Sequence, residues 1–254
     1  MGEATSSGRR WSRTRRIIGG TALVLAVLSA TYIFLGRSSL LDVEEVEIYG
    51  IHRITAVEIE EKLGFRRGDP LLSVDSQEVQ RNLELLPWVL AADVERQWNG
   101  LIRVGIVERR AIALAMVAPK RWALIDISGR VLTEALPFPP DLPRLSGVHA
   151  AGTPGSYMST DSTALLAVLG ALPTELGQRF KSIRRDPAND EIVGDLKSGQ
   201  EVVFGDDGRL SAKVIALAAT LTHLEDQNRN DRYIDVSTPR DVLVRNDPER
   251  PKTP

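Results

Sequence analysis

The stretch Val89–Arg109, VLAADVERQWNGLIRVGIVER, decides the fold of the first part of this chain. Two extended segments flank Trp98-Asn99-Gly100, and Asn-Gly supplies the positive-φ positions of a type I′ turn, so we predict a β-hairpin. Apolar side chains alternate along the second strand, which places three of them on one face: Ile102, Val104 and Ile106. Arg103 and Gly105 are then expected on the opposite face.

The residues before the hairpin predict one strand and two helices. Val43–Tyr49 alternates in polarity, which is typical of a half-buried strand. Thr55-Ala56-Val57-Glu58 has the spacing of a capping box and predicts the start of a helix. A second helix, capped by Asp75 or Ser76, ends at Pro87. The order β-α-α-β-β predicts a three-stranded sheet with both helices on one face.

Further upstream, Ile17–Gly36 (IIGGTALVLAVLSATYIFLG) is a run of 20 residues without a charged side chain. A helix of that length spans about 30 Å, the thickness of a bilayer core. Five arginines precede the run, between residues 9 and 16. Because basic flanks stay in the cytoplasm, we predict a cytoplasmic basic tail at residues 1–16, a single transmembrane helix at residues 17–36 and an extracytoplasmic remainder.

Three alternatives for this run remain open. A cleavable signal peptide has a shorter apolar region and small residues at its cleavage site, whereas Leu28 occupies the −3 position of the best candidate, Ala30. Thr14-Arg15-Arg16-Ile17-Ile18 faintly resembles a twin-arginine export signal. The third alternative is a buried soluble helix, and the length of the run and its flanking arginines argue against it.

Residues 111–245 predict a mixed α/β domain dominated by antiparallel sheet. Ala111–Val117 is a continuous apolar run, typical of a strand that is buried on both faces. Helical spacing occurs at residues 160–172 and again after Asp206-Asp207-Gly208, where one stripe holds Leu210, Val214, Leu217, Leu221 and Leu224. Residues 137–160 are rich in turn formers and predict a loop. Further strands are predicted at residues 122–127, 130–133, 180–185, 191–196, 201–204, 233–236 and 241–245.

The composition excludes disulfides and thiolate metal sites and argues against nucleic-acid binding. The chain has no cysteine, so disulfides and thiolate metal sites are excluded. Its net charge of −2 combines a basic tail, which holds five arginines and one glutamate in residues 1–16, with an acidic remainder. An acidic ectodomain lacks the electrostatic footprint of nucleic-acid binding, so membrane topology explains the basic tail better.

The sequence contains no pattern typical of a catalytic, cofactor or metal site. Its three histidines fall in separate predicted elements: His52, His149 and His223. Asp226-x-Asn228-x-Asn230 imitates the start of a calcium loop, but Asp231 stands where the loop needs glycine, and Ser237 stands where it needs glutamate. We therefore predict no catalytic residue, no cofactor, no metal and no small-molecule substrate.

A β-α-α-β-β module directly after a membrane anchor resembles a POTRA domain. The hairpin residues that carry this likeness are Pro87-Trp88-Val89, Val94-Glu95-Arg96-Gln97-Trp98, Leu101-Ile102-Arg103-Val104 and Val107-Glu108-Arg109. Together with Gly50-Ile51-His52 and Leu142-Pro143-x-Leu145-x-Gly147, they resemble the FtsQ/DivIB family of bacterial cell-division proteins. That family usually carries proline shortly after Glu-Arg, where this chain has Arg110-Ala111.

The resemblance implies an α+β architecture with a POTRA domain at residues 43–110, an FtsQ-type β domain at residues 111–245 and a disordered tail at residues 246–254. It also implies a bitopic, non-enzymatic divisome scaffold in the cell membrane at the septum, which helps control septal peptidoglycan synthesis. In this family the last strands of the β domain receive the FtsB/FtsL pair. The transmembrane helix and the POTRA domain are the implied elements for contact with other division proteins.

The expected partner-binding residues lie at the end of the β domain. A terminal strand presents unpaired backbone groups to which another chain can add a strand. The residues expected at this surface are Tyr233, Asp235, Asp241, Val242, Leu243, Val244 and Arg245. Tyr233 matches an aromatic position beside the surface and is expected either to anchor the partner or to pack in the core.

Two other functions remain open from the sequence. The first is a membrane-anchored or exported envelope enzyme, which a cleft that gathers perturbed titratable groups would support. The second is a POTRA module that serves protein translocation. Such modules usually come in tandem, and the sequence contains one such unit before residue 111.

Overall fold

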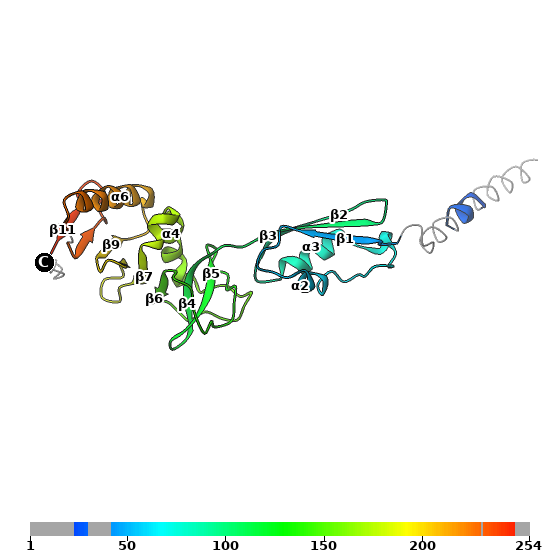
Figure 1. The fold of residues 1–254 in the computed structure, drawn as a ribbon, viewed down its shortest axis with the longest axis horizontal. Helices are drawn as coiled ribbons and strands as arrows, with labels where there is room; N and C mark the ends of the chain where they lie inside the picture. Colours follow the sequence, from blue (N-terminus) through cyan, green and yellow to red (C-terminus); the bar gives the residue numbers. More distant parts are fainter. Residues whose placement is uncertain (1–22, 30–41, 230, 247–254) are drawn as a thin grey trace, which may run out of the picture. The chain divides into compact units, whose positions relative to one another are not determined.

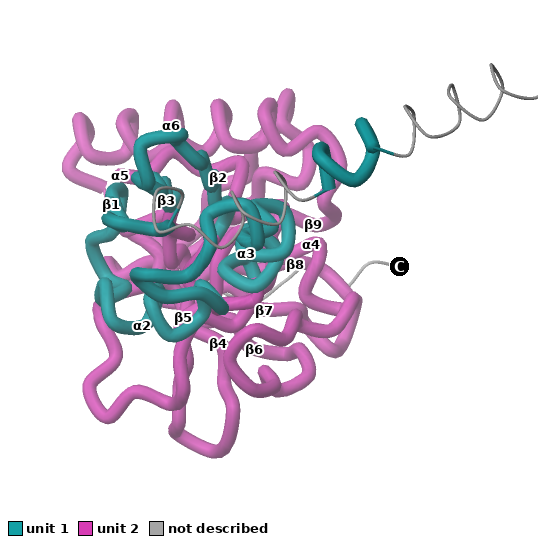
Figure 2. Tube along the Cα trace, turned by 90° about the vertical axis from the view of Figure 1, so that its right-hand side faces the viewer, with its two compact units in different colours: residues 1–84, 90–107 teal, residues 85–89, 108–254 magenta. Residues whose placement is uncertain are grey.

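The computed structural model describes residues 23–29, 42–229 and 231–246. The chain divides into two compact units, residues 1–84 with 90–107 and residues 85–89 with 108–254 (Figure 2). The predicted basic tail, the last eight residues and both ends of the predicted membrane helix lie outside the described residues. Residues 23–29 are helical, and in the described parts of the chain no helix has the length and hydropathy needed to span a bilayer.

The first unit has the predicted β-α-α-β-β order (Figure 1). Its elements are β1 (Glu45–Tyr49), α2 (Ala56–Glu60), the 3-10 helix η2 (Leu71–Ser73), α3 (Ser76–Glu84), β2 (Val89–Arg96) and β3 (Leu101–Glu108). The strand order is β1-β3-β2, so β3 is central, and β1 runs parallel to it. Ile102, Val104 and Ile106 of β3 are buried, which confirms the predicted inner face.

Both helices of the first unit begin at predicted caps. The amide of Glu58 donates to Thr55 Oγ1 at 3.3 Å, and the amide of Thr55 donates to Glu58 Oε2 at 2.8 Å, which completes the capping box. At α3, the Asp75 carboxylate accepts hydrogen bonds from the amides of Gln77 and Glu78. These bonds satisfy amides that the first turn of a helix leaves without an internal partner.

Replacing Thr55 with alanine is expected to destabilise the first unit by about 1 kcal/mol, because the helix loses its cap. The amide and the hydroxyl of Thr55 hold the pKa of Glu58 below its usual range, so loss of the hydroxyl raises that pKa. Denaturant unfolding and an NMR titration of the Glu58 carboxyl measure the two effects. Thr55→Ser, which keeps the hydroxyl, is the control, and an unmoved Glu58 pKa in the alanine variant would contradict this geometry.

The predicted type I′ turn in the hairpin is wrong. The amide of Gly100 donates to the carbonyl of Gln97 at 3.2 Å, so Trp98 and Asn99 are the central residues of the turn. A type I′ turn needs positive φ at both central residues, but in this loop only Gly100 has one, at +83°. The loop is therefore a tight turn followed by a glycine bulge. The bulge has a tertiary partner, because the amide of Glu44 donates to the Gly100 carbonyl at 2.9 Å.

The second unit is built on a mixed sheet of eight described strands. They are β4 (Ala111–Ala118), β5 (Arg121–Asp126), β6 (Arg144–Ser146), β7 (Phe180–Arg185), β8 (Ile192–Leu196), β9 (Glu201–Gly205), β10 (Tyr233–Asp235) and β11 (Leu243–Arg245). Their order in the sheet is β11-β10-β9-β8-β7-β6-β4-β5. The pairs β9/β10, β4/β6 and β6/β7 are parallel, so antiparallel pairing dominates less than predicted.

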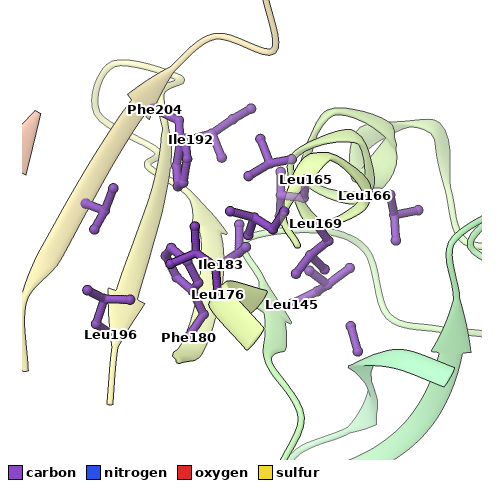
Figure 3. Packing of buried hydrophobic residues seen from close by; sticks show 14 of the residues in the cluster. Leu145, Leu165, Leu166, Leu169, Leu176, Phe180, Ile183, Ile192, Leu196 and Phe204 are labelled. Atoms are coloured by element: carbon purple, nitrogen blue, oxygen red, sulfur yellow. The ribbon is translucent and has the colours of Figure 1, made fainter. Parts of the chain in front are cut away.

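Helices α4 (Thr163–Ala171), α5 (Thr174–Gln178) and α6 (Leu210–Asp226) contribute to the main apolar cluster of the second unit. Leu165 and Leu169 project from α4 toward the sheet, where Ile183 of β7 lies in the same cluster (Figure 3). The predicted stripe of α6 is confirmed, since four of its five members are buried and the fifth is half-buried. Lys213 on α6 is also buried, and its Nζ donates to the Asp206 carbonyl at 2.9 Å.

Residues 130–133, predicted as a strand, form isolated bridges rather than a regular strand. Two further short elements depart from the prediction. The expected loop at residues 137–160 contains β6, whose Leu145 is buried and which pairs in parallel with both β4 and β7. The five-residue helix α5 is the second. A three-residue strand is too short to show alternation in the sequence, and its two neighbours here are far from it along the chain.

Candidate partner-binding edge

Strand β11 forms one edge of the eight-stranded sheet. It pairs with β10 in antiparallel register, and β10 pairs on its other side with β9 in parallel register. Among the described residues, no strand lies on the outer side of β11. Within the described part of the chain, β11 is therefore open to pairing with another strand, as a binding edge requires.

The opposite edge of the same sheet is covered by the chain itself. Strand β5 accepts backbone hydrogen bonds from the segment that follows it: the amide of Leu132 donates to the Leu124 carbonyl, and the amide of Leu136 donates to the Trp122 carbonyl, both at 2.8 Å. Residues 130–136 thus shield β5. Native proteins commonly cover edges in this way, which makes the open edge at β11 informative.

The backbone directions in β10 are set by its bonds to β9. The carbonyl of Arg232 accepts from β9 at 2.8 Å, and the amide of Val236 donates to β9 at 2.9 Å. Alternate residues of a strand direct their backbone groups to the same side, so Ile234 also faces β9. Tyr233 and Asp235 consequently face β11.

These directions determine which way the backbone N–H and C=O of Val244 point. In the register, Tyr233 lies opposite Arg245, Ile234 opposite Val244, and Asp235 opposite Leu243. Hydrogen-bonded and non-hydrogen-bonded pairs alternate along an antiparallel ladder, so Val244 belongs to a non-hydrogen-bonded pair. Its N–H and C=O therefore point away from β10, toward the outer edge of the sheet.

The expected site residues divide between the two faces of the sheet. Val242 and Val244 pack against the main apolar cluster of the second unit. Leu243, which is 36% exposed, alternates with them and lies on the other face. Asp241 is exposed, and its amide donates to the Thr238 carbonyl at 3.0 Å, which closes the turn before β11. The side chains of Val242 and Val244 thus hold β11 against the core of the second unit.

Tyr233 lies inside the molecule's own packing. It is 4% exposed and forms a small cluster with Val193 of β8 and Val203 of β9. Its hydroxyl donates to Asp235 Oδ2 at 3.5 Å, and Asp235 Oδ1 accepts the amide of Ser237 at 2.9 Å. Of the two roles expected for Tyr233, core packing is the one that its burial favours. The tyrosine supports β10, on which the open edge rests.

Carboxyl groups with a shifted pKa are scattered and have local structural partners. Burial opposes ionisation of Asp126 and Asp161, but hydrogen bonds from their neighbours outweigh it and lower both pKa values. The pKa of Asp206 is lowered first by a hydrogen bond from Lys213. Within the described ranges, no group of three or more ligand-type side chains is placed to hold a metal ion.

Comparison with known proteins identifies the family. A family model described as "POTRA domain, FtsQ-type" matches residues 41–109. The cell division protein FtsQ of Streptomyces bingchenggensis is 32% identical over 224 residues, which cover 86% of this chain and 83% of that protein. The chain belongs to the FtsQ family. The FtsQ protein of Mycobacterium tuberculosis is 30% identical over 231 residues, covering 89% of this chain and 69% of the relative.

A solved structure is also similar in part. The major extracytoplasmic domain of the cell-division protein DivIB from Geobacillus stearothermophilus matches 48% of this chain and 98% of its own, with 21% identity and a TM-score of 0.34. That partial likeness adds nothing to the assignment, which rests on the FtsQ relatives. As a member of the FtsQ family, the chain is a cell-division protein, a component of the divisome with protein partners, and a scaffold rather than an enzyme.

Proposed function

We propose that this FtsQ-family chain captures the FtsB/FtsL-type pair by strand addition at β11 and so helps control septal peptidoglycan synthesis. The observation that carries the proposal is the outward direction of the Val244 N–H and C=O on an edge that no described strand covers. Main-chain hydrogen bonds supply affinity in this mode of recognition, and the flanking side chains supply specificity. The flanking residues are Asp241, Val242, Leu243 and Arg245, with Tyr233 and Asp235 behind them on β10.

The proposal includes the placement of the chain in the cell. We propose that residues 17–36 cross the cell membrane once, with residues 1–16 in the cytoplasm, because of their length, their lack of charge and the arginines before them. Residues 43–110 and 111–245 then act outside the cytoplasm at the division septum. The POTRA domain and the transmembrane helix would contact other divisome components.

The test is capture of the FtsB/FtsL-type pair from the same organism by the full chain in lipid nanodiscs. Val244→Pro removes the outward amide and places a ring at the edge, so capture is expected to fall to background. Proline is tolerated at the outer side of an edge strand, so β11 should stay paired with β10. Hydrogen exchange at Tyr233 and Asp235 reports whether that pairing survives.

Two further variants make the result decisive. Val244→Ile keeps the amide and should capture the pair as the parent chain does. Deletion of residues 240–254 removes the whole edge strand and should match the proline variant. Unchanged capture by Val244→Pro, with exchange protection intact on β10, would overturn strand addition at this edge and leave the division role resting on the family alone.

A further inference from the structure

The hairpin tip and residues 42–44, which precede β1, lie at the same end of the three-stranded sheet. The amide of Glu44 donates to the Gly100 carbonyl at 2.9 Å, and a Cβ on Gly100 would lie 2.8 Å from the Asp42 carbonyl oxygen. On the other side, the amide of Val43 donates to the Asp69 carbonyl at 2.9 Å. Residues 42–44 are thus held between the hairpin tip and the loop that contains Asp69.

This end of the unit carries two exposed apolar side chains. Trp98 at the hairpin tip is 79% exposed, and Leu72 of η2 is 40% exposed. Both line one shallow hollow, together with Leu71, Arg96 and Gln97. The guanidinium of Arg96 donates to the Val74 carbonyl at 2.7 Å, which ties η2 to the hairpin and keeps the two apolar side chains together.

The chain limits how far this end can lie from a bilayer. Six residues, 37–42, join the predicted membrane helix to Val43. Even when fully extended, six residues span only about 20 Å. Because residues 42–44 contact the hairpin tip, that tip lies within a similar reach of the membrane surface.

We propose that Trp98 and Leu72 insert into the headgroup region of the outer leaflet and seat the first unit on the membrane. Tryptophan is the side chain that favours this interface most, since its ring is apolar and its N–H can bond to water or headgroups. The inference rests on the proposed membrane helix and goes beyond partner capture at β11.

The contact is apolar rather than electrostatic. The charged side chains near the tip have opposite signs: Arg96 lines the hollow itself, while Asp42 and Glu44 lie beside Gly100 and Asp69 lies beside Val43. Anionic lipid therefore gains little from this surface. The depth of the tip should not change between phosphatidylcholine bilayers and bilayers with added phosphatidylglycerol, nor when the salt concentration is raised.

The test measures the depth of spin labels on the full chain in nanodiscs, and the absence of native cysteine makes single labelling sites clean. A label at Asn99→Cys reports the tip. A label at Leu90→Cys, an exposed position near the far end of β2, is the matched control. The measured quantity is the ratio of the spin label's collisions with oxygen, which enters the bilayer, to its collisions with a nickel chelate, which stays in water. This ratio should place residue 99 in the headgroup region and residue 90 in water. Adding Trp98→Ser and Leu72→Ser should move the label at residue 99 into water.

Each outcome bears on the proposal. If residues 99 and 90 are equally accessible to water, and the chain still resists alkaline extraction from vesicles, the insertion of Trp98 and Leu72 is contradicted while the membrane helix is not. Extraction of the chain at alkaline pH would contradict both the membrane helix and the insertion of Trp98 and Leu72. Loss of tip insertion at high salt would overturn an apolar contact. Capture of the FtsB/FtsL-type pair, which uses β11, should be unchanged by Trp98→Ser, so failure of this inference is distinguishable from failure of the proposed function.

Discussion

Replacing Gly50 with alanine is expected to unfold the sheet of the first unit. Gly50 has a φ of +81°, and a Cβ there would lie 2.1 Å from the carbonyl oxygen of Ile106. Ile106 lies on β3, the central strand, so its backbone has no freedom to retreat. Left-handed strain and overpacking each contribute about 1–3 kcal/mol, and their upper sum of about 6 kcal/mol exceeds the roughly 5 kcal/mol of a marginally stable domain.

The chain offers a matched control for this substitution. Gly64 has a φ of +75°, but a Cβ there would meet no atom within 4 Å. Gly64→Ala should therefore carry only the left-handed strain, about 1–2 kcal/mol. Hydrogen-exchange mass spectrometry on peptides from β1 and β3 measures the difference, with peptides from β8 and β9 as internal reference. Equal protection of β1 in the two variants would contradict the predicted clash.

Replacing Asp126 with asparagine is expected to destabilise the second unit by about 3–5 kcal/mol, the size typical of breaking a buried ion pair. The Asp126 side chain is 4% exposed and the Arg109 side chain 10%, and Arg109 Nη1 donates to Asp126 Oδ2 at 2.6 Å. Oδ1 accepts from the amide of Ser128 at 2.9 Å and from the amide of Arg130 at 2.8 Å. Without the carboxylate, the guanidinium of Arg109 stays buried without a counter-charge.

The same carboxylate predicts a pH dependence. Burial alone would raise the pKa of Asp126, but hydrogen bonds from Ser128, Arg109 and Arg130 outweigh burial and lower it. The folded protein therefore binds this proton less tightly than the unfolded chain does. Its stabilising contribution is complete above about pH 4, the ordinary range of aspartate, and is lost as the pH falls through the lower folded-state value.

Denaturant unfolding at several pH values tests both statements. The parent chain should lose stability in acid as the Asp126 carboxylate is protonated. Asp126→Asn should lose less stability between neutral and acid pH, because it has already lost the charge of this carboxylate at neutral pH. The double variant Arg109→Met, Asp126→Asn removes both charges and keeps an oxygen at residue 126 for the amides of Ser128 and Arg130. It should recover part of the loss, because no buried charge is left behind. A single variant as stable as the parent at pH 7 would contradict the role of the ion pair.

The elements that the sequence predicts best are those with a long local signal. The alternation of Ile102, Val104 and Ile106 places the inner face of β3 correctly, and the apolar stripe places α6. The capping box at Thr55 needs only four adjacent residues. In each case the information lies within a single turn, strand or helix, so no knowledge of distant contacts is required.

The errors arise where distant contacts decide the geometry. Asn-Gly favours a type I′ turn by itself, but here the Gly100 carbonyl accepts a hydrogen bond from Glu44, and the loop takes a glycine bulge instead. The strand β6 is three residues long and shows no alternation, yet it is fixed by parallel pairing on both sides. The burial of Tyr233 depends on Val193 and Val203, which its own strand does not specify.

By itself, the sequence determined a run of 20 residues without charge, a β-α-α-β-β module and an apolar strand at the end of the β domain, because spacing and caps are local properties. Only the tertiary structure decided that β11 is an edge and that Val244 turns its N–H and C=O outward. The order of strands and the direction of their backbone groups depend on pairing between segments far apart in the chain, and no local pattern contains that pairing.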